Sequence, residues 1–214
     1  MTAIAVSLFC AFAAEADAQV TIGAALGQSL QSAGASDNPH LEPGFGGTSL
    51  AGVGMIDVAV RPRVGIGAEV SLAGDITGVQ SQRVAEGTNA LVSNHHDTFF
   101  SGVLKVGTRS DQRVRAAAII GGGIAQRHTE RTVTFQPFIP PPPKQPPTLE
   151  VLSDTVFALT TGADVVVGIN DHVALLGIGR LYLLADDDRV PGGDVHRGVS
   201  SAIFRIGGGL QIRF

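Results

Sequence analysis

The sequence has almost no cysteine and very few polar aromatic residues. Among its 214 residues there are one cysteine, one tyrosine and no tryptophan. With Cys10 as the only thiol, no disulfide can form within the chain. A fold held together by disulfide bonds is therefore excluded.

The sequence also has no excess of basic residues. Lysine and arginine together number 15, against 19 aspartate and glutamate residues, which gives a net charge of -4. No lysine-rich stripe is present that would attract a phosphate backbone. We therefore expect no nucleic-acid partner.

Long hydrophobic runs are lacking beyond the amino terminus. A membrane helix needs about 18 or more predominantly apolar residues in a row. Asp164 interrupts the stretch VFALTTGADVVVG, and Arg180 interrupts HVALLGIGRLYLLA. The sequence predicts no membrane-spanning helix in these stretches.

The amino terminus has the features of an export signal. An apolar stretch from Ala3 to Ala14 precedes Ala16, Asp17 and Ala18, a small-x-small tripeptide of the kind that signal peptidase cleaves. We predict a signal peptide over residues 1–18 and a single domain over residues 19–214, with a buried amino-terminal helix as the alternative. Cleavage would remove Cys10, and a chain without thiols suits an oxidising compartment.

Apolar residues alternate with small or polar ones along most of the remaining chain, and this period of two is typical of β-strands. The clearest case is the stretch VGIGAEVSL, in which every second residue is apolar. Eight such segments are predicted to be strands: Val20–Leu30, Leu50–Val60, Val64–Leu72, Thr98–Thr108, Val114–Gln126, Val156–Gly168, Val173–Leu183 and Ala202–Phe214.

The connections between these segments are short and long in turn. The short ones contain the proline, asparagine, aspartate and serine residues of tight turns. They are predicted at Arg61–Arg63, Arg109–Arg113 and Ile169–His172. The long ones are predicted to be solvated loops at the opposite end: Gln31–Ser49, Gln80–Asp97, Arg127–Thr155 and Ala185–Ser200.

Two strand-like stretches lie inside the third long connection. Arg131–Gln136 reads RTVTFQ and Thr148–Leu152 reads TLEVL. We expect them to lengthen the fifth and sixth strands above the membrane. A barrel of ten strands, in which they pair as an additional hairpin, is the alternative.

The two faces of the segments indicate a barrel with its apolar side outward. The other face is mostly glycine, alanine, serine and threonine with one or two charges per strand, which is too little charge for a solvated exterior. Segments of this length can cross a bilayer, and the sheet must close because unpaired backbone groups in lipid cost several kcal/mol each. We therefore predict an all-β fold, an eight-stranded antiparallel up-and-down transmembrane β-barrel. Side chains just fill the interior of a barrel of that size, and the many glycines leave room inside it.

With these features the chain resembles the small outer-membrane β-barrel proteins of Gram-negative bacteria, the group that includes OmpA, OmpX and OmpW. The resemblance covers the whole chain after the predicted signal peptide. It implies location in the outer membrane, with both termini in the periplasm and the long loops outside the cell. It also implies that the last strand, which ends on an aromatic residue, is an assembly signal that the barrel-assembly machinery reads, through Phe204, Ile206, Leu210, Ile212 and Phe214.

Charged residues fall on the face that is predicted to line the lumen. Because a buried charge without a partner costs several kcal/mol, we expect acids and bases to pair there. The pairs are predicted to plug the lumen and fix the strand register, with a gate or narrow ion path as the alternative. The predicted lumen charge network comprises Asp57, Glu69, Lys105, Arg115, Asp164, Arg180 and Arg205, and the first five are expected in one layer near the short turns.

The long loops contain three further features. The stretch Pro137–Pro147 is expected to be extended polyproline II, because proline lacks the amide hydrogen that a sheet needs. Histidines are expected to gather at the loop end: His40, His95, His96, His128 and His196. Neither His95-His96-Asp97 nor Asp186-Asp187-Asp188 with Asp194 has the spacing of a known metal site, so we predict no metal and no cofactor.

No catalytic motif is present in the sequence. The pattern G-x-S-x-G is absent, and the glycines of IIGGGIAQ lack the lysine of a phosphate-binding loop. We predict a non-enzymatic, monomeric outer-membrane protein with a largely closed lumen, which contacts outer-membrane lipid and lipopolysaccharide and acts in envelope structure or through its loops. The alternatives are an enzyme that modifies lipid A, a narrow pore and a soluble calycin-like carrier.

Overall fold

The structure is a computed structural model that describes residues 19–31, 47–84, 87–109, 112–137, 147–185 and 202–214. The predicted signal peptide lies outside these residues and stays a prediction. The described residues form nine strands: β1 (Val20–Gln31), β2 (Gly47–Arg61), β3 (Val64–Ala73), β4 (Ile76–Val84), β5 (Gly87–Gly107), β6 (Val114–Pro137), β7 (Thr148–Gly168), β8 (Val173–Leu184) and β9 (Ala202–Arg213).

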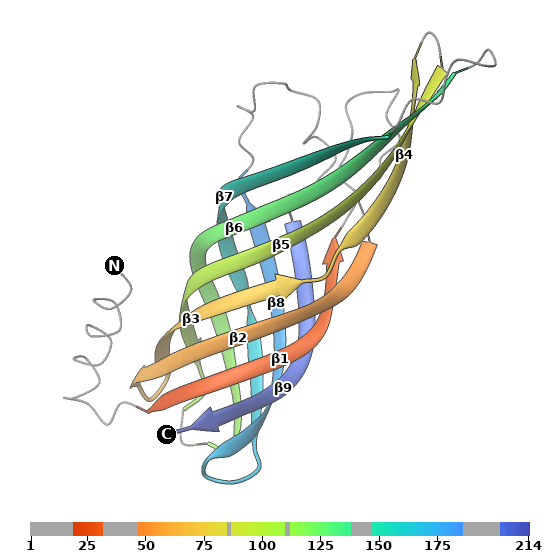
Figure 1. Ribbon diagram of the computed structural model, residues 1–214. Coiled ribbons are helices and arrows are strands. Elements are labelled where there is room, and N and C mark those ends of the chain that lie inside the picture. Colours follow the sequence, from red (N-terminus) through yellow and green to blue (C-terminus); the bar gives the residue numbers. More distant parts are fainter. Residues whose placement is uncertain (1–18, 32–46, 85–86, 110–111, 138–146, 186–201) are drawn as a thin grey trace.

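Eight of these strands form a closed antiparallel ring (Figure 1). Each pairs with its neighbour along the chain, except that β3 pairs directly with β5 over Val64–Leu72 and β1 closes the ring against β9. The tight turns and the carboxy-terminal end of β9 lie at one end of the ring, and the upper ends of β4 to β7 rise from the other. The predicted eight-stranded antiparallel barrel is confirmed.

The ninth strand, β4, lies outside the ring and pairs with the upper part of β5. The prediction of a solvated loop over Gln80–Asp97 is therefore wrong. The hairpin of β4 and β5 was not predicted because alternation of apolar and polar residues indicates a strand only where one face of that strand is apolar. On the upper part of β5 the buried face carries the polar residues Ser93, His95 and Asp97, so apolar residues do not mark it and the signal disappears.

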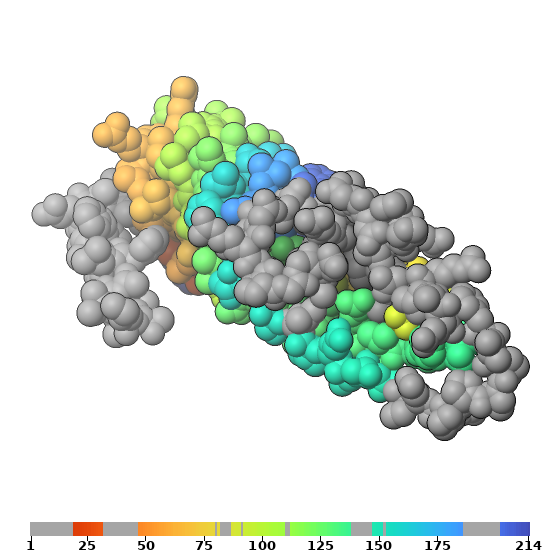
Figure 2. All heavy atoms as spheres, turned by 90° about the horizontal axis from the view of Figure 1, so that it is seen from above, coloured from red at the N-terminus to blue at the C-terminus, as the bar shows by residue number. Residues whose placement is uncertain are grey.

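The strands β6 and β7 also continue far beyond the ring, as expected for RTVTFQ and TLEVL. They pair without interruption from Val114 with Val167 to Val133 with Thr148. Most of the predicted loop Arg127–Thr155 is thus strand. Seen from above, the green and teal atoms of these strands extend to one side of the ring (Figure 2). We call this projecting part, formed by β4 and the upper halves of β5, β6 and β7, the upper sheet.

Large apolar side chains cover the outside of the ring. Leu26 of β1, Ile120 of β6 and Leu210 of β9 are more than half exposed. In each strand these outward-facing residues alternate with residues that turn inward. An exposed apolar belt of this extent is stable against lipid and unstable against water. Among the described residues no helix is long and apolar enough to cross a membrane.

Two glycines permit close approach at the seam where β1 meets β9. A Cβ atom at Gly27 would overlap the carbonyl oxygen of Ile206, and one at Gly209 would overlap that of Ala24. Gly54, by contrast, has open space where a Cβ would lie. The narrow ring therefore depends on particular glycines, not on glycine content in general.

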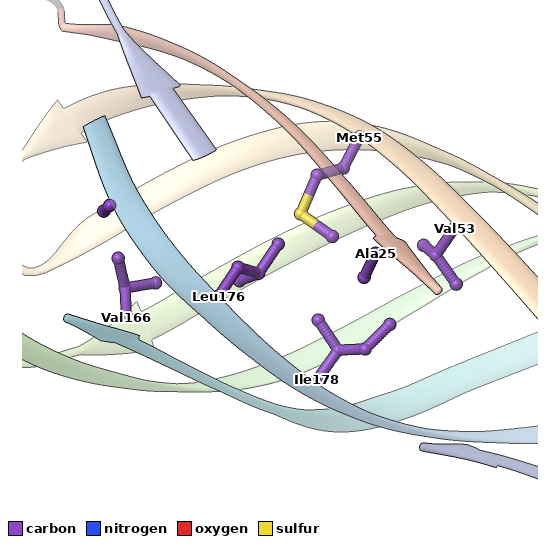
Figure 3. Packing of buried hydrophobic residues seen from close by; sticks show 7 residues of the cluster. Ala25, Val53, Met55, Val166, Leu176 and Ile178 are labelled. Carbon is purple, nitrogen blue, oxygen red and sulfur yellow. The ribbon is translucent and has the colours of Figure 1, made fainter. Parts of the chain in front are cut away.

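Apolar side chains also fill part of the lumen (Figure 3). Met55 and Val53 of β2 lie opposite Leu176 and Ile178 of β8. The lumen-facing side of the strands was expected to carry mostly small and charged residues. The interior is instead closed in part by ordinary hydrophobic packing, and the cluster comprises Ala25, Val53, Met55, Val166, Ala174, Leu176 and Ile178.

Candidate functional site: the charged lumen

Five charged side chains meet in the part of the lumen nearer the tight turns, and we call them the ion-pair cluster. Its members are Asp57, Glu69, Lys105, Asp164 and Arg180. They come from five different strands of the ring, and each is no more than 9% exposed. The cluster therefore ties together strands that are not all neighbours in the sheet.

The amino group of Lys105 holds two carboxylates at once. Its Nζ atom donates to Oδ2 of Asp57 and Oδ2 of Asp164, each at 2.8 Å. Oε1 of Glu69 lies 3.8 Å away. The ammonium group thus takes the position that a counter-ion would need beside these carboxylates.

The guanidinium of Arg180 binds the remaining acid in a two-pronged contact. Its Nε and Nη2 atoms donate to the two oxygens of Glu69, and Nη1 lies 2.7 Å from Oδ1 of Asp164. Nη1 also donates to the carbonyl oxygens of Ala163 and Gly179. Paired in this way, buried charges of both signs can be retained where an isolated one would be expelled.

A small cavity opens below the cluster at the tight-turn end. It measures about 110 Å³ and its lining includes Asp57, Lys105 and Asp164 together with Arg61 and Arg63 of the β2–β3 turn. Oδ1 of Asp57 accepts no hydrogen bond from the described residues. Three carboxylates against two cations leave the cluster with a net charge of -1.

Arg205 lies higher in the lumen and does not join the ion-pair cluster. Its guanidinium donates to the hydroxyls of Ser29 and Ser71 and to the carbonyl oxygen of Asp97. Its Cζ atom is 4.7 Å from the centre of the Phe99 ring and 5.4 Å from that of Tyr182. We call Arg205, Phe99, Tyr182, Ser29 and Ser71 the arginine–aromatic cluster.

The two rings of this cluster stack on each other. Phe99 and Tyr182 have centroids 4.0 Å apart at an interplanar angle of 20°. Both side chains are fully buried, and Ile203 packs in the same hydrophobic group. Neither ring was predicted to line the lumen, although Tyr182 shares a face of β8 with the predicted lumen residue Arg180.

Arg115 also lies apart from the other predicted lumen charges. It donates to Oε1 of Gln211 at 3.0 Å, and Gln211 donates in turn to Thr21. This chain of polar groups lies at the tight-turn mouth. Of the five charges expected in one layer, the structure brings together Asp57, Glu69, Lys105 and Asp164, and it adds Arg180 in place of Arg115.

A further buried pair lies above the arginine–aromatic cluster. His95 and Asp97 of β5 are each 2% exposed, and their Nε2 and Oδ2 atoms are 3.0 Å apart. Nδ1 of His95 lies 2.8 Å from the hydroxyl of Thr129 on β6. His95 and Asp97 were expected in or at the end of a loop, and both are in a strand. Spacing of two residues on one strand is the signal that would have placed them on a common face.

A second set of polar side chains lies on the outer face of β5 and β6, opposite the face that carries His95 and Asp97. His96 contacts Asp75, and His128 contacts Ser153. The remaining predicted loop features lie outside the described residues: His40, His196, Asp186, Asp187, Asp188, Asp194 and positions 138–146 of the predicted polyproline stretch Pro137–Pro147. Its first residue, Pro137, is not polyproline II but the last residue of β6, paired with Gly87. Among the residues that are described, no three His, Cys, Asp or Glu side chains converge as a preformed metal site.

The carboxy-terminal strand has the orientation that its pattern predicts. Phe204, Ile206, Leu210, Ile212 and Phe214 are all exposed on the outer face. Arg205 and Gln211 turn into the lumen. The strand β9 pairs with β1 and β8, so it closes the ring.

Of the comparisons with known proteins, only the one with solved structures bears on the architecture. No protein-family model matches the chain, and no curated protein matches its sequence. Among solved structures, a major outer membrane protein from Thermus thermophilus is similar over 92% of this chain and 99% of that chain, with 12% identity and a TM-score of 0.56.

Two further solved structures match with lower scores. Ail, the attachment invasion locus protein of Yersinia pestis, is 13% identical over 92% of this chain and 98% of its own, with a TM-score of 0.43. The outer membrane protease OmpT of Escherichia coli is 9% identical over 92% of this chain and 97% of its own, with a TM-score of 0.45. This chain has the fold of the small outer-membrane β-barrel proteins. A shared fold does not define an activity.

Proposed function

We propose that this protein is a non-enzymatic, monomeric outer-membrane barrel with a closed lumen, which acts in envelope structure or through surface contacts at its loop end. The observation that carries the proposal is the ion-pair cluster. Lys105 and Arg180 span the lumen to three carboxylates on other strands. Opening a path for ions would require these pairs to separate in a buried setting, which costs several kcal/mol.

The arginine–aromatic cluster, which lies higher in the lumen, also supports a closed barrel. The stacked rings of Phe99 and Tyr182 and the guanidinium of Arg205 form a second layer across the lumen. Two separate layers would have to rearrange before a solute could pass. Structure and adhesion, not transport, are the roles that such a filled barrel supports.

The orientation follows from the two unlike ends. We place both chain ends and the tight turns in the periplasm and the upper sheet outside the cell. The apolar outer belt would then contact outer-membrane lipid, and polar residues above it would meet lipopolysaccharide. In the upper sheet β4 pairs only with β5 among the described residues, which leaves one strand edge of backbone groups for a surface partner there.

The outward-facing terminal strand supports a role in assembly. Phe214 is 70% exposed at the tight-turn end of the outer surface, where other proteins can reach it before insertion. We propose that the barrel-assembly machinery reads Phe204, Ile206, Leu210, Ile212 and Phe214. Deletion of Phe214 is then expected to reduce insertion more than the loss of one lipid contact would, while normal insertion of the deletion variant would contradict this part of the proposal.

A second candidate function has one observation in its favour. Nδ1 of His128 lies 3.0 Å from the hydroxyl of Ser153, and its Nε2 lies 3.7 Å from Oε1 of Glu130. A serine, a histidine and a carboxylate in this order could act on an acyl ester of an outer-membrane lipid. Mass spectrometry of lipid A from cells with the wild-type chain and with Ser153→Ala separates the candidates, because only an enzyme changes the lipid products.

Cysteine labelling tests the proposed location and orientation. Cys10 is removed if the signal peptide is cleaved, so single cysteines can be introduced at Thr148, in the upper sheet, and at Asp171, in the β7–β8 turn. A membrane-impermeant thiol reagent is expected to label Thr148→Cys in intact cells and Asp171→Cys only after the outer membrane is opened. The reverse pattern, or recovery of the protein in the soluble periplasmic fraction, would overturn the proposal.

A further inference from the structure

Two histidines lie side by side on the outer surface of the barrel. His96 of β5 and His128 of β6 are direct partners in the strand register. Their ring centroids are 5.0 Å apart, with 33° between the ring planes. Their side chains are 37% and 33% exposed, so both rings can be reached from solvent.

This separation suits two ligands of one metal ion. Imidazole nitrogens bind zinc at about 2.0–2.1 Å, and in a tetrahedral complex two such rings have centroids about 5 Å apart. Cross-strand partners on one face hold their side chains at the spacing of the sheet, which fixes this distance before any ion arrives. Little ordering of the two side chains would then be needed on binding.

In each of the two histidines a hydrogen bond at Nδ1 leaves Nε2 available to coordinate a metal ion. Nδ1 of His96 is 2.7 Å from Oδ1 of Asp75, so the proton lies on Nδ1 and the lone pair on Nε2. Nδ1 of His128 is 3.0 Å from the Ser153 hydroxyl. A carboxylate that holds the non-coordinating nitrogen of a histidine is the usual support of a protein metal ligand.

The surroundings favour a cation and leave room for its water ligands. The two rings line a surface groove of about 470 Å³ together with Ser153, Asp154 and Arg127. The Arg127 side chain is only 10% exposed, and its Nε lies 3.7 Å from Oδ1 of the buried Asp97. Oε1 of Glu130 lies 3.7 Å from Nε2 of His128, and Asp75 adds a second carboxylate beside His96. The site lies directly above the outward-facing Phe100 and Ile124, at the upper edge of the apolar belt.

We propose that His96 and His128 bind one divalent transition-metal ion of the zinc, nickel and copper class through their Nε2 atoms. No third protein ligand has converged among the described residues, so water completes the coordination. Imidazole suits these metals and not magnesium or calcium, which prefer oxygen. Two side-chain ligands give a reversible surface site and not a permanent structural metal.

Calorimetric titration of the folded full barrel in detergent with ZnCl₂ tests this proposal. We expect one zinc per chain in the wild type, and binding at least about tenfold weaker in His96→Gln and in His128→Gln. Asp75→Asn, which removes only the support of His96, is expected to weaken binding by about tenfold. MgCl₂ in place of ZnCl₂ is expected to give no binding.

His172→Gln is the matched control, because His172 is an exposed histidine in the β7–β8 turn at the other end. It is expected to bind zinc like the wild type, and heat-modifiable migration on a gel shows that each variant is folded. Zinc binding that is unchanged in both His96→Gln and His128→Gln, or no zinc binding by the wild type, would overturn the proposal. Ser153→Ala separates this site from an acyl-ester site, since the metal site predicts that zinc binding survives in that variant.

Discussion

The two clusters in the lumen surround their buried arginines, Arg180 and Arg205, with different kinds of groups. In the ion-pair cluster Arg180 faces Glu69 and Asp164, so each charge is balanced by an opposite one. In the arginine–aromatic cluster the direct contacts of Arg205 are hydroxyls, a carbonyl oxygen and the faces of two rings. Both arginine side chains are essentially fully buried, at 0% and 1% exposed.

The difference decides what the loss of each arginine leaves behind. Removal of Arg180 leaves buried carboxylates without their partner, and an unpaired buried charge is the more costly state. Removal of Arg205 leaves two hydroxyls and a carbonyl oxygen without one hydrogen bond each. The one carboxylate nearby, that of Asp97, keeps Arg127 and His95 as partners. We therefore expect two equally buried arginines to contribute unequally to stability.

The largest effect is expected for Arg180→Met. This change keeps much of the side-chain volume and leaves Glu69 and Asp164 with only Lys105, so the free energy of unfolding should fall by about 3–5 kcal/mol. Urea unfolding of the barrel in lipid vesicles measures the change. Arg63→Met, the same replacement at an exposed turn residue, serves as the control and should change stability by less than about 0.5 kcal/mol.

A smaller loss is expected for Arg205→Met, of about 1–2 kcal/mol, from the cation–π contacts and the hydrogen bonds to Ser29 and Ser71. The same unfolding experiment gives the value. A loss equal to that of Arg180→Met would mean that the two environments stabilise a guanidinium equally well, which would contradict the expected difference between the clusters.

Phe99→Leu sharpens the comparison within the upper cluster. Leucine keeps an apolar side chain but removes the stacked ring and one cation–π contact. The expected loss is about 1 kcal/mol. In a double-mutant cycle with Arg205→Met the two effects should not add, because they share one contact.

The smallest effect is expected for Asp57→Asn. Lys105 keeps its contact with Asp164, and the net charge of the cluster changes from -1 to 0. The loss of one charged hydrogen bond is then offset by the removal of the excess negative charge, so the free energy of unfolding should change by less than about 1 kcal/mol. A loss as large as that of Arg180→Met would show that the acids of the cluster do not share their cations.

The sequence predicts the ring far better than the contents of the lumen. Alternation alone assigns residues to the inner or outer face, which is why Glu69, Lys105 and Arg180 could be placed inside. It does not say which inner residues meet, because that depends on the tilt of the strands and on closure between β3 and β5 and between β1 and β9. Arg180 and Glu69 are 111 residues apart and no local pattern pairs them.

The upper sheet shows where the same signal fails. In β4 the apolar residues do not keep to one face, because Ile76 is 7% exposed while Val79, on the opposite face, is 68% exposed. The seam glycines could not be separated from the others either. Gly209 meets the backbone of β1 while Gly54 meets nothing, and this contrast exists only in three dimensions.

The central claim is that the lumen is closed, and single-channel recording of the folded full chain in a planar lipid bilayer tests it most directly. The wild type is expected to insert without stable conductance steps, and Arg63→Met should behave in the same way. Arg180→Met, which breaks the ion-pair cluster, should raise the frequency of brief openings. A stable open pore in the wild type would contradict the account.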